Sequence, residues 1–168
     1  MLSENINPYK FRFAGDEFNS YLFTTVQGAA YTVKFKPTPY LFEAYSEIRE
    51  QVYELVIDLT RPTSSKPRLD PAIAVTIAAI CHDFFVDKER ILLYICETAD
   101  ARHMARVRKF GAWFYEFNDS GFLKIDTSFP DTNGITYYLS LIFRMGHPHR
   151  HTIIDEFERL ARNYNEDK

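Results

Sequence analysis

The sequence predicts an α+β fold, with a mixed, mainly antiparallel sheet and about three helices packed chiefly on one face. Short β-rich runs separated by turn residues fill most of residues 1–60. Beyond them, two segments with helical spacing of apolar residues lie on either side of residues 91–96. That short run is apolar throughout, which is the pattern of a strand covered on both faces. A strand placed between two helices can add one parallel pair to the sheet.

The size and composition of the chain indicate one globular domain over residues 1–168. Hydrophobic residues make up 46% and charged residues 26%, a balance typical of folded proteins. The net charge of −3 means that a nucleic-acid partner would need a local basic patch. No apolar run approaches the roughly 20 residues that cross a bilayer, and the N-terminus lacks the apolar region of a signal peptide. We therefore expect a cytoplasmic protein without a membrane partner, in which Cys81 and Cys96 are buried thiols.

Four strands are predicted in the first part of the chain, each a β-rich run that stops at turn residues. The second and third form a hairpin, because Gln27-Gly28 between them supplies a turn. The segment from Tyr40 to Gln51 is expected to hold a short helix. The strands are expected at residues 10–14, 21–26, 30–36 and 52–59.

The first long helix is predicted from Asp70 to about Phe85. Asp70 can accept hydrogen bonds from the first backbone N–H groups, and Pro71 is tolerated at the first helical position. Apolar residues occupy more than one side of this helix, so we expect it to be buried on more than one side.

The second long helix follows residues 91–96 directly, beginning at Glu97 or Thr98 and ending near Phe117. Two further strands, residues 122–129 and 135–144, flank an Asn-Gly pair that favours a type I′ turn, so they should pair as a hairpin.

A last helix is predicted after a loop at residues 146–151. Thr152 with Asp155 three residues later resembles a capping box, and apolar residues recur beyond it at helical spacing.

One stripe of the second long helix combines cations with the only tryptophan of the chain. At about 100° per residue, Phe110 and Phe114 share the face that enters the core. The adjacent stripe consists of Arg102, Arg106, Lys109 and Trp113. Such cations can hold phosphates while an indole stacks on a base, as in proteins that bind single strands. The ordinary structural alternative is a solvated helix edge, whose long cations cover core aromatics with their stems.

Two carboxylates lie where the apolar strand meets this helix. Glu97 ends the strand and Asp100 follows it, at the carboxyl end of the strand, where sites are often built. The pair could act as acid and base or bind a metal. Equally, acids at a helix N-terminus complement its dipole.

The histidines offer weaker signals. His147, His149 and His151 alternate, as ligands of zinc or nickel could, but Pro148 spoils the regularity and no metal is predicted. His82 is interpreted as a core histidine in preference to a catalytic base. No cofactor is predicted, because the common hydrolase, nucleotide-binding and calcium-binding motifs are absent from the sequence.

A distinctive block of residues consists of Leu93-Tyr94-Ile95-Cys96-Glu97, Asp100, Arg102, Arg106, Arg108-Lys109-Phe110 and Trp113-Phe114. Through this block the sequence resembles an uncharacterised family of small bacterial proteins of unknown function. Outer landmarks of the same family are found at residues 31–35 and 137–141. The family often has Asp at the position of Glu97, and the resemblance implies a stand-alone domain without implying an activity, substrate or cofactor.

We therefore interpret the chain as a non-enzymatic binding or interaction domain. Its predicted ligand-binding residues are Arg102, Arg106, Lys109, Trp113 and Glu97, and the partner is an anionic ligand, a nucleic acid or a protein. The alternative is an enzyme of the toxin or defence-effector type that acts on RNA or another phosphate-containing substrate. In that case Glu97, with His103 or His82, would transfer protons.

Overall fold

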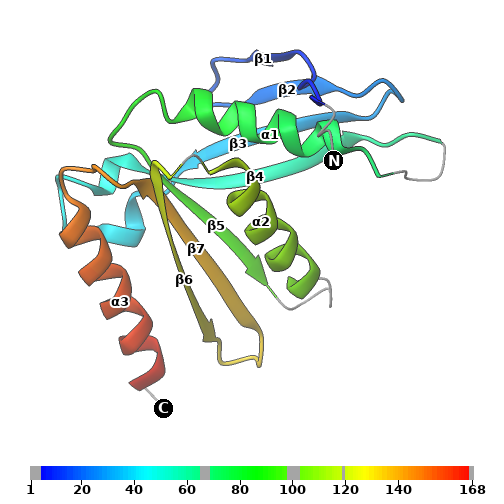
Figure 1. The fold of residues 1–168 in the computed structure, drawn as a ribbon. Coiled ribbons are helices and arrows are strands. Elements are labelled where there is room, and N and C mark those ends of the chain that lie inside the picture. The colour runs from blue at the N-terminus through cyan, green and yellow to red at the C-terminus, as the bar shows by residue number, and fades with distance from the viewer. Residues whose placement is uncertain (1–4, 65–68, 98–102, 119, 167–168) are drawn as a thin grey trace. The chain divides into compact units, whose positions relative to one another are not determined.

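The computed structural model describes residues 5–64, 69–97, 103–118 and 120–166. Within these residues, one seven-stranded sheet has the order β1-β2-β3-β4-β5-β7-β6 and is accompanied by three α-helices and two short 3-10 helices (Figure 1). β4 and β5 pair in parallel, whereas β1–β2, β2–β3, β5–β7 and β6–β7 are antiparallel. The predicted α+β class with a mixed, mainly antiparallel sheet is confirmed.

The strands are β1 Phe11–Phe13, β2 Tyr21–Thr24, β3 Ala30–Pro37, β4 Val52–Arg61, β5 Ile91–Glu97, β6 Phe122–Pro130 and β7 Thr136–Arg144. The helices are η1 Pro39–Phe42, η2 Arg49–Gln51, α1 Pro71–Phe84, α2 His103–Phe117 and α3 Arg150–Glu166. Two 3-10 helices therefore occupy the segment where one short helix was predicted. Glu97, one of the two predicted starts of α2, is the last residue of β5, and the other, Thr98, lies outside the described part of the chain.

The backbone divides into two compact units, residues 1–36 with 55–87 and residues 37–54 with 88–168. The single domain expected over residues 1–168 stays a prediction.

In the first unit, α1 packs on β3 through two aromatic rings. Phe84 and Phe35 are fully buried and stack with centroids 3.9 Å apart. The helix begins as predicted, because the Asp70 carboxylate accepts a hydrogen bond from Ala72 N at 3.0 Å. Tyr9, from the segment before β1, donates its backbone N–H to Thr76 Oγ1 at 2.8 Å, which ties that segment to α1.

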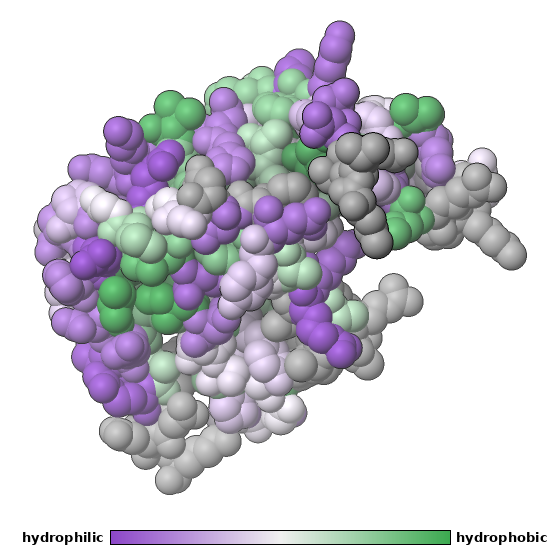
Figure 2. Space-filling view, in the orientation of Figure 1, coloured by the Kyte–Doolittle hydropathy of each residue, from purple (hydrophilic) through white to green (hydrophobic). Residues whose placement is uncertain are grey.

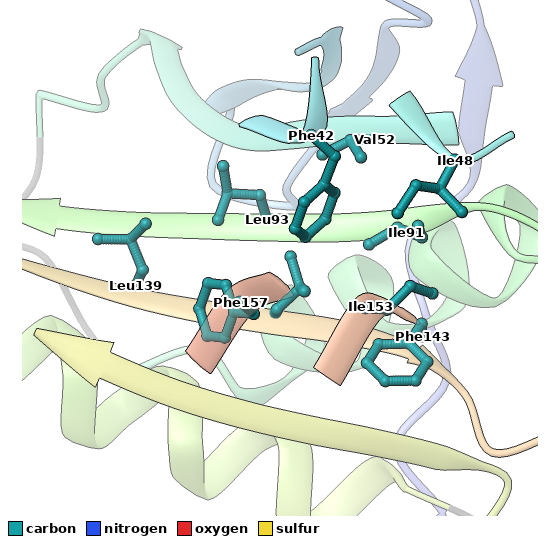
Figure 3. Close-up of a cluster of buried hydrophobic side chains, with 10 residues drawn as sticks. Phe42, Ile48, Val52, Ile91, Leu93, Leu139, Phe143, Ile153 and Phe157 are labelled. Carbon is teal, nitrogen blue, oxygen red and sulfur yellow. The ribbon is translucent and has the colours of Figure 1, made fainter. Parts of the chain in front are cut away.

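In the second unit, β5 is covered on both faces, which explains its unbroken apolar sequence. On one face, Tyr94 stacks on Phe110 of α2 with centroids 4.0 Å apart. On the other face, Ile91 and Leu93 belong to a cluster that includes Ile153 of α3. Figure 3 shows side chains of this cluster from η1, β4, β5, β7 and α3 gathered together. The helices of this unit are thus divided between the two faces of its strands, whereas helices packed chiefly on one face were predicted.

The β6–β7 hairpin is confirmed, but its turn is not type I′. Asp131 N donates to Ile135 O at 2.7 Å, and the intervening loop has three residues. Gly134 adopts φ +80°, whereas Asn133 stays outside the left-handed region. The Asp131 carboxylate accepts hydrogen bonds from Asn133 N at 2.7 Å and Ile135 N at 3.0 Å, so it selects the longer loop over the two-residue turn.

The start of α3 also differs from the prediction. The helix begins at Arg150, so Thr152 lies inside it and does not form the predicted capping box with Asp155. The first turn is joined to the preceding residues by hydrogen bonds from Arg150 N to His147 O at 3.1 Å and from Ile153 N to His149 O at 3.0 Å. Part of the predicted loop is therefore helical.

Hydrophilic residues cover most of the molecular face drawn in Figure 2, where hydrophobic residues form small separate groups. Contiguous exposed apolar patches usually mark association surfaces. On this face, the described residues form no large apolar patch of that kind.

Candidate functional site

The inner face of α2 is fixed by Phe110, which is 8% exposed and stacks on Tyr94 of β5. Because successive helical residues are about 100° apart, this contact decides which residues of α2 face outward. The side of the helix opposite Phe110 carries exposed residues at Ala105, Arg108, Lys109, Ala112, Tyr115 and Glu116.

Lys109 and Trp113, two of the predicted site residues, lie next to each other on the edge of α2. Lys109 is exposed and its Nζ lies 5.0 Å from the centroid of the Trp113 ring, a cation–π distance. Trp113 is half-buried. The sequence predicts that the cation binds a phosphate and that the indole stacks on a base, as separate groups. In the structure, Lys109 and Trp113 instead contact each other.

The other three predicted residues cannot be added to this geometry. Arg102 lies outside the described residues, and the side chains of Arg106 and Glu97 lie outside the described part of the structure. Asp100 and the side chain of His103 also lie outside the described part of the structure.

Two exposed residues of α2 were missed by the sequence reasoning. Tyr115 is 84% exposed, so most of its ring is open to solvent. Arg108 is also exposed, and it lies seven positions before Tyr115, nearly two helical turns. The signal was present in the spacing, because both residues lie opposite Phe110. We call the exposed set Arg108, Lys109, Ala112 and Tyr115 the α2 face.

The α2 face is basic although the chain as a whole is acidic. Within α2, Arg106, Arg108 and Lys109 are accompanied by a single acid, Glu116, whereas the whole chain has a net charge of −3. The small side chain of Ala112 leaves the surface between the cations and Tyr115 unobstructed. The arrangement offers cationic donors and an accessible ring on one rigid element, which is suited to binding an anion that also carries a planar group.

The three alternating histidines do not converge. His147 is buried, its Nε2 lies 2.8 Å from Glu89 O, and its Nδ1 accepts a hydrogen bond from His149 N at 3.0 Å. Both ring nitrogens are thereby occupied by backbone groups. Among the described residues, no group of three His, Cys, Asp or Glu side chains is placed to hold a metal ion.

His82 is exposed near the end of α1, so the interpretation as a core histidine is wrong. The helix turns its apolar residues inward and leaves this position on the surface. Its neighbour Asp83 accepts a 2.6 Å hydrogen bond from the hydroxyl of Tyr21.

Another polar cluster lies in the second unit, between the segment that follows η1 and α3. The carboxylate of Glu156 is buried and accepts hydrogen bonds from Tyr45 Oη at 2.7 Å and from Arg159 Nε at 2.9 Å. These residues, with Tyr40 and Leu160, line a pocket of about 370 Å³. Both carboxylate oxygens are engaged, since Arg159 Nη2 donates to the second at 2.8 Å, so the cluster is a link between segments and not a free acid.

The two cysteines are free thiols. Cys96 is buried as predicted, whereas part of the surface of Cys81 is exposed. Within the described residues, no helix is long and apolar enough to span a membrane.

Comparisons with known proteins place the chain in a family. A model described as a family of unknown function, DUF6169, matches residues 69–159, more than half of the 168 residues. The match contains α2 and the residues 93–114 on which the resemblance was based, as well as residues 137–141, while residues 31–35 precede it. No curated protein and no solved structure matches the chain. The chain therefore belongs to DUF6169, a family of unknown function.

Proposed function

We propose that this protein is a non-enzymatic binding domain that recognises an anionic partner through the α2 face. The observation that carries the proposal is that α2 presents both the exposed Lys109, in cation–π contact with Trp113, and the exposed ring of Tyr115. Arg106 and Arg102, three and seven positions before Lys109, and Glu97 at the end of β5 remain in the proposed surface on the strength of sequence spacing.

Single-stranded nucleic acid is the partner whose chemistry fits this surface best. Its phosphates would contact Arg108 and Lys109, and an unpaired base would stack on Tyr115. A duplex hides the faces of its bases, so it would offer only its phosphates. Cytoplasmic location and bacterial origin are part of the same proposal, and the two free thiols, Cys81 and Cys96, support an intracellular setting.

Trp113 provides a direct test because it is the only tryptophan in the chain. Its fluorescence should change when single-stranded oligouridylate RNA is added, and the affinity should fall as salt is raised. A fluorescently labelled copy of the RNA gives the same affinity by anisotropy, independently of any change that a variant makes to Trp113 emission.

Substitutions on α2 and outside it test whether the RNA binds to the α2 face. Lys109→Ala and Tyr115→Ala should each weaken RNA binding about tenfold, as loss of one phosphate contact or one stacked base would. Lys88→Ala and Tyr40→Ala replace an exposed lysine and an exposed tyrosine outside α2 and should leave the affinity unchanged. Equal losses in all four variants, or none, would contradict the assignment to α2. Cleavage of the RNA during the titration would instead favour the enzymatic alternative.

A further inference from the structure

β6 is the last strand of the sheet, and its outer side carries backbone groups that β7 does not use. Met145 N donates to Gly121 O at 2.9 Å and Asp131 N donates to Ile135 O at 2.7 Å, so odd-numbered positions form the hydrogen-bonded pairs with β7. The even-numbered residues of β6, among them Lys124 and Asp126, therefore direct their N–H and C=O groups away from β7.

Two opposite charges lie side by side at the centre of this edge. Lys124 Nζ is 2.6 Å from one carboxylate oxygen of Asp126 and 2.7 Å from the other. The Lys124 side chain is 13% exposed, whereas that of Asp126 is 62% exposed and also accepts a hydrogen bond from Ser140 Oγ at 2.7 Å. An inward-pointing lysine alone would discourage pairing of an edge strand. Asp126 lies two residues further along the same face, so each lysine has an oppositely charged neighbour and the edge can still pair with another strand.

The edge is self-complementary in one register. If two copies of β6 run antiparallel about a twofold axis through Ile125, Lys124 of each copy lies opposite Asp126 of the other. Both residues have outward backbone groups, so the same register also lets the strands exchange N–H···O=C hydrogen bonds. Each ammonium would then lie between two carboxylates, one from each copy.

Neighbouring registers are worse for identifiable reasons. An axis through Lys124 or Asp126 places a like charge opposite itself, which is destabilising. If the axis passes between two adjacent residues, the outward backbone groups of one copy lie opposite residues of the other copy whose backbone groups already bind β7. The alternation of charge therefore selects the axis at Ile125.

Ile125 suits the axis position. It is partly buried and packs against the core cluster on the side of β6 that α3 covers. On the axis it would face its own copy as a non-hydrogen-bonded pair, the kind in which Cα atoms come within about 4.5 Å and side chains contact closely.

We propose that two copies of this chain associate through β6, antiparallel about a twofold axis at Ile125, with Lys124 of one copy paired to Asp126 of the second copy. The surface is separate from the α2 face, and the proposal does not depend on the proposed function.

Charge reversal tests the pairing. Lys124→Asp and Asp126→Lys each place like charges opposite each other at both ends of the axis and should raise the dimer dissociation constant about tenfold or more. An equimolar mixture of the two variants should recover dimers, because every cross-strand pair is then again of opposite sign. Analytical ultracentrifugation measures both effects, and circular dichroism checks that each variant is folded. A folded wild-type protein that remains monomeric at every concentration overturns the proposal.

Cysteine crosslinking tests the register. Ile125→Cys on the axis should form an intermolecular disulfide under mild oxidation, since its Cβ would face its own copy. Thr127→Cys is the matched control, because it would face position 123 of the second copy and should not crosslink to itself. Dimers that crosslink equally through both positions, or through Thr127→Cys alone, would rule out an axis at Ile125.

Discussion

The hydroxyl of Tyr45 lies 2.7 Å from a carboxylate oxygen of Glu156, a residue 111 positions later in the chain. Arg159 binds the other oxygen of the same carboxylate through Nε and Nη2. The three side chains tie the segment after η1 to α3 beside the core cluster shown in Figure 3. We therefore expect the stability of the second unit to depend on the charge of this acid.

Replacing Glu156 with Gln should make stability less sensitive to acid. Hydrogen bonds from Arg159 and then from Tyr45 hold the pKa of Glu156 below its ordinary value. A carboxyl whose folded pKa is lowered stabilises the fold above its unfolded pKa, and this contribution is lost as pH falls through the folded pKa. The free energy of unfolding of the wild type should therefore fall more between neutral and acidic pH than that of Glu156→Gln.

Urea unfolding across that pH range measures the difference. Glu158→Gln is the control, because Glu158 is exposed on the same helix. Its pH profile should follow the wild type. Parallel profiles for wild type and Glu156→Gln would show that the link does not depend on the carboxylate charge.

Phe84→Ala should be among the most damaging substitutions in the first unit. Phe84 is fully buried and stacked on Phe35, so truncation removes its buried surface and leaves a cavity, at a cost of about 3–5 kcal/mol. Val86→Ala, two residues later and 72% exposed, should change stability by about 0.5 kcal/mol or less. Chemical denaturation compares them, and similar losses in the two variants would contradict the packing described for α1.

His147→Ala should destabilise the protein by about 1–3 kcal/mol, because it removes the partner of two backbone groups, Glu89 O and His149 N. His151→Ala should have little effect, since His151 is exposed. Zinc should not raise the melting temperature of the wild type, because both nitrogens of His147 are already occupied. A zinc-dependent rise that disappears in His147→Ala would restore the metal alternative.

Cys81 should resist alkylation in the native protein although part of the residue is exposed. Burial of its thiol raises the pKa of Cys81 to about 12, so the reactive thiolate is scarce at neutral pH. Mass spectrometry after iodoacetamide treatment should show slow labelling of both Cys81 and Cys96 until denaturant is added. Rapid labelling of Cys81 in the folded state would contradict this.

Most of the fold could be predicted from sequence because its signals are local. Asp70-Pro71 begins α1, and the apolar run at residues 91–96 is the strand between two helices. The errors came from competing side-chain contacts. Asp131 holds the β6–β7 turn in a three-residue form, and His147 lies buried under the start of α3, where a polar loop was expected.

The candidate site was predictable only in part. Spacing placed Lys109 and Trp113 together, but it could not show that they contact each other or that Tyr115 is the more open ring. Exposure depends on which helix face meets β5, and that is decided by the stacking of Phe110 on Tyr94. The spacing had already set Tyr115 opposite Phe110, but a helical repeat does not give the extent to which the ring is exposed.

The most direct test of the proposed function is a titration of isotope-labelled protein with single-stranded oligouridylate RNA, followed by amide NMR. Shifts and broadening should centre on residues 105–116 of α2 and should decrease as salt is added. Changes centred on the pocket beside Tyr45 and Glu156, or no changes at low salt, would contradict the assignment of recognition to the α2 face.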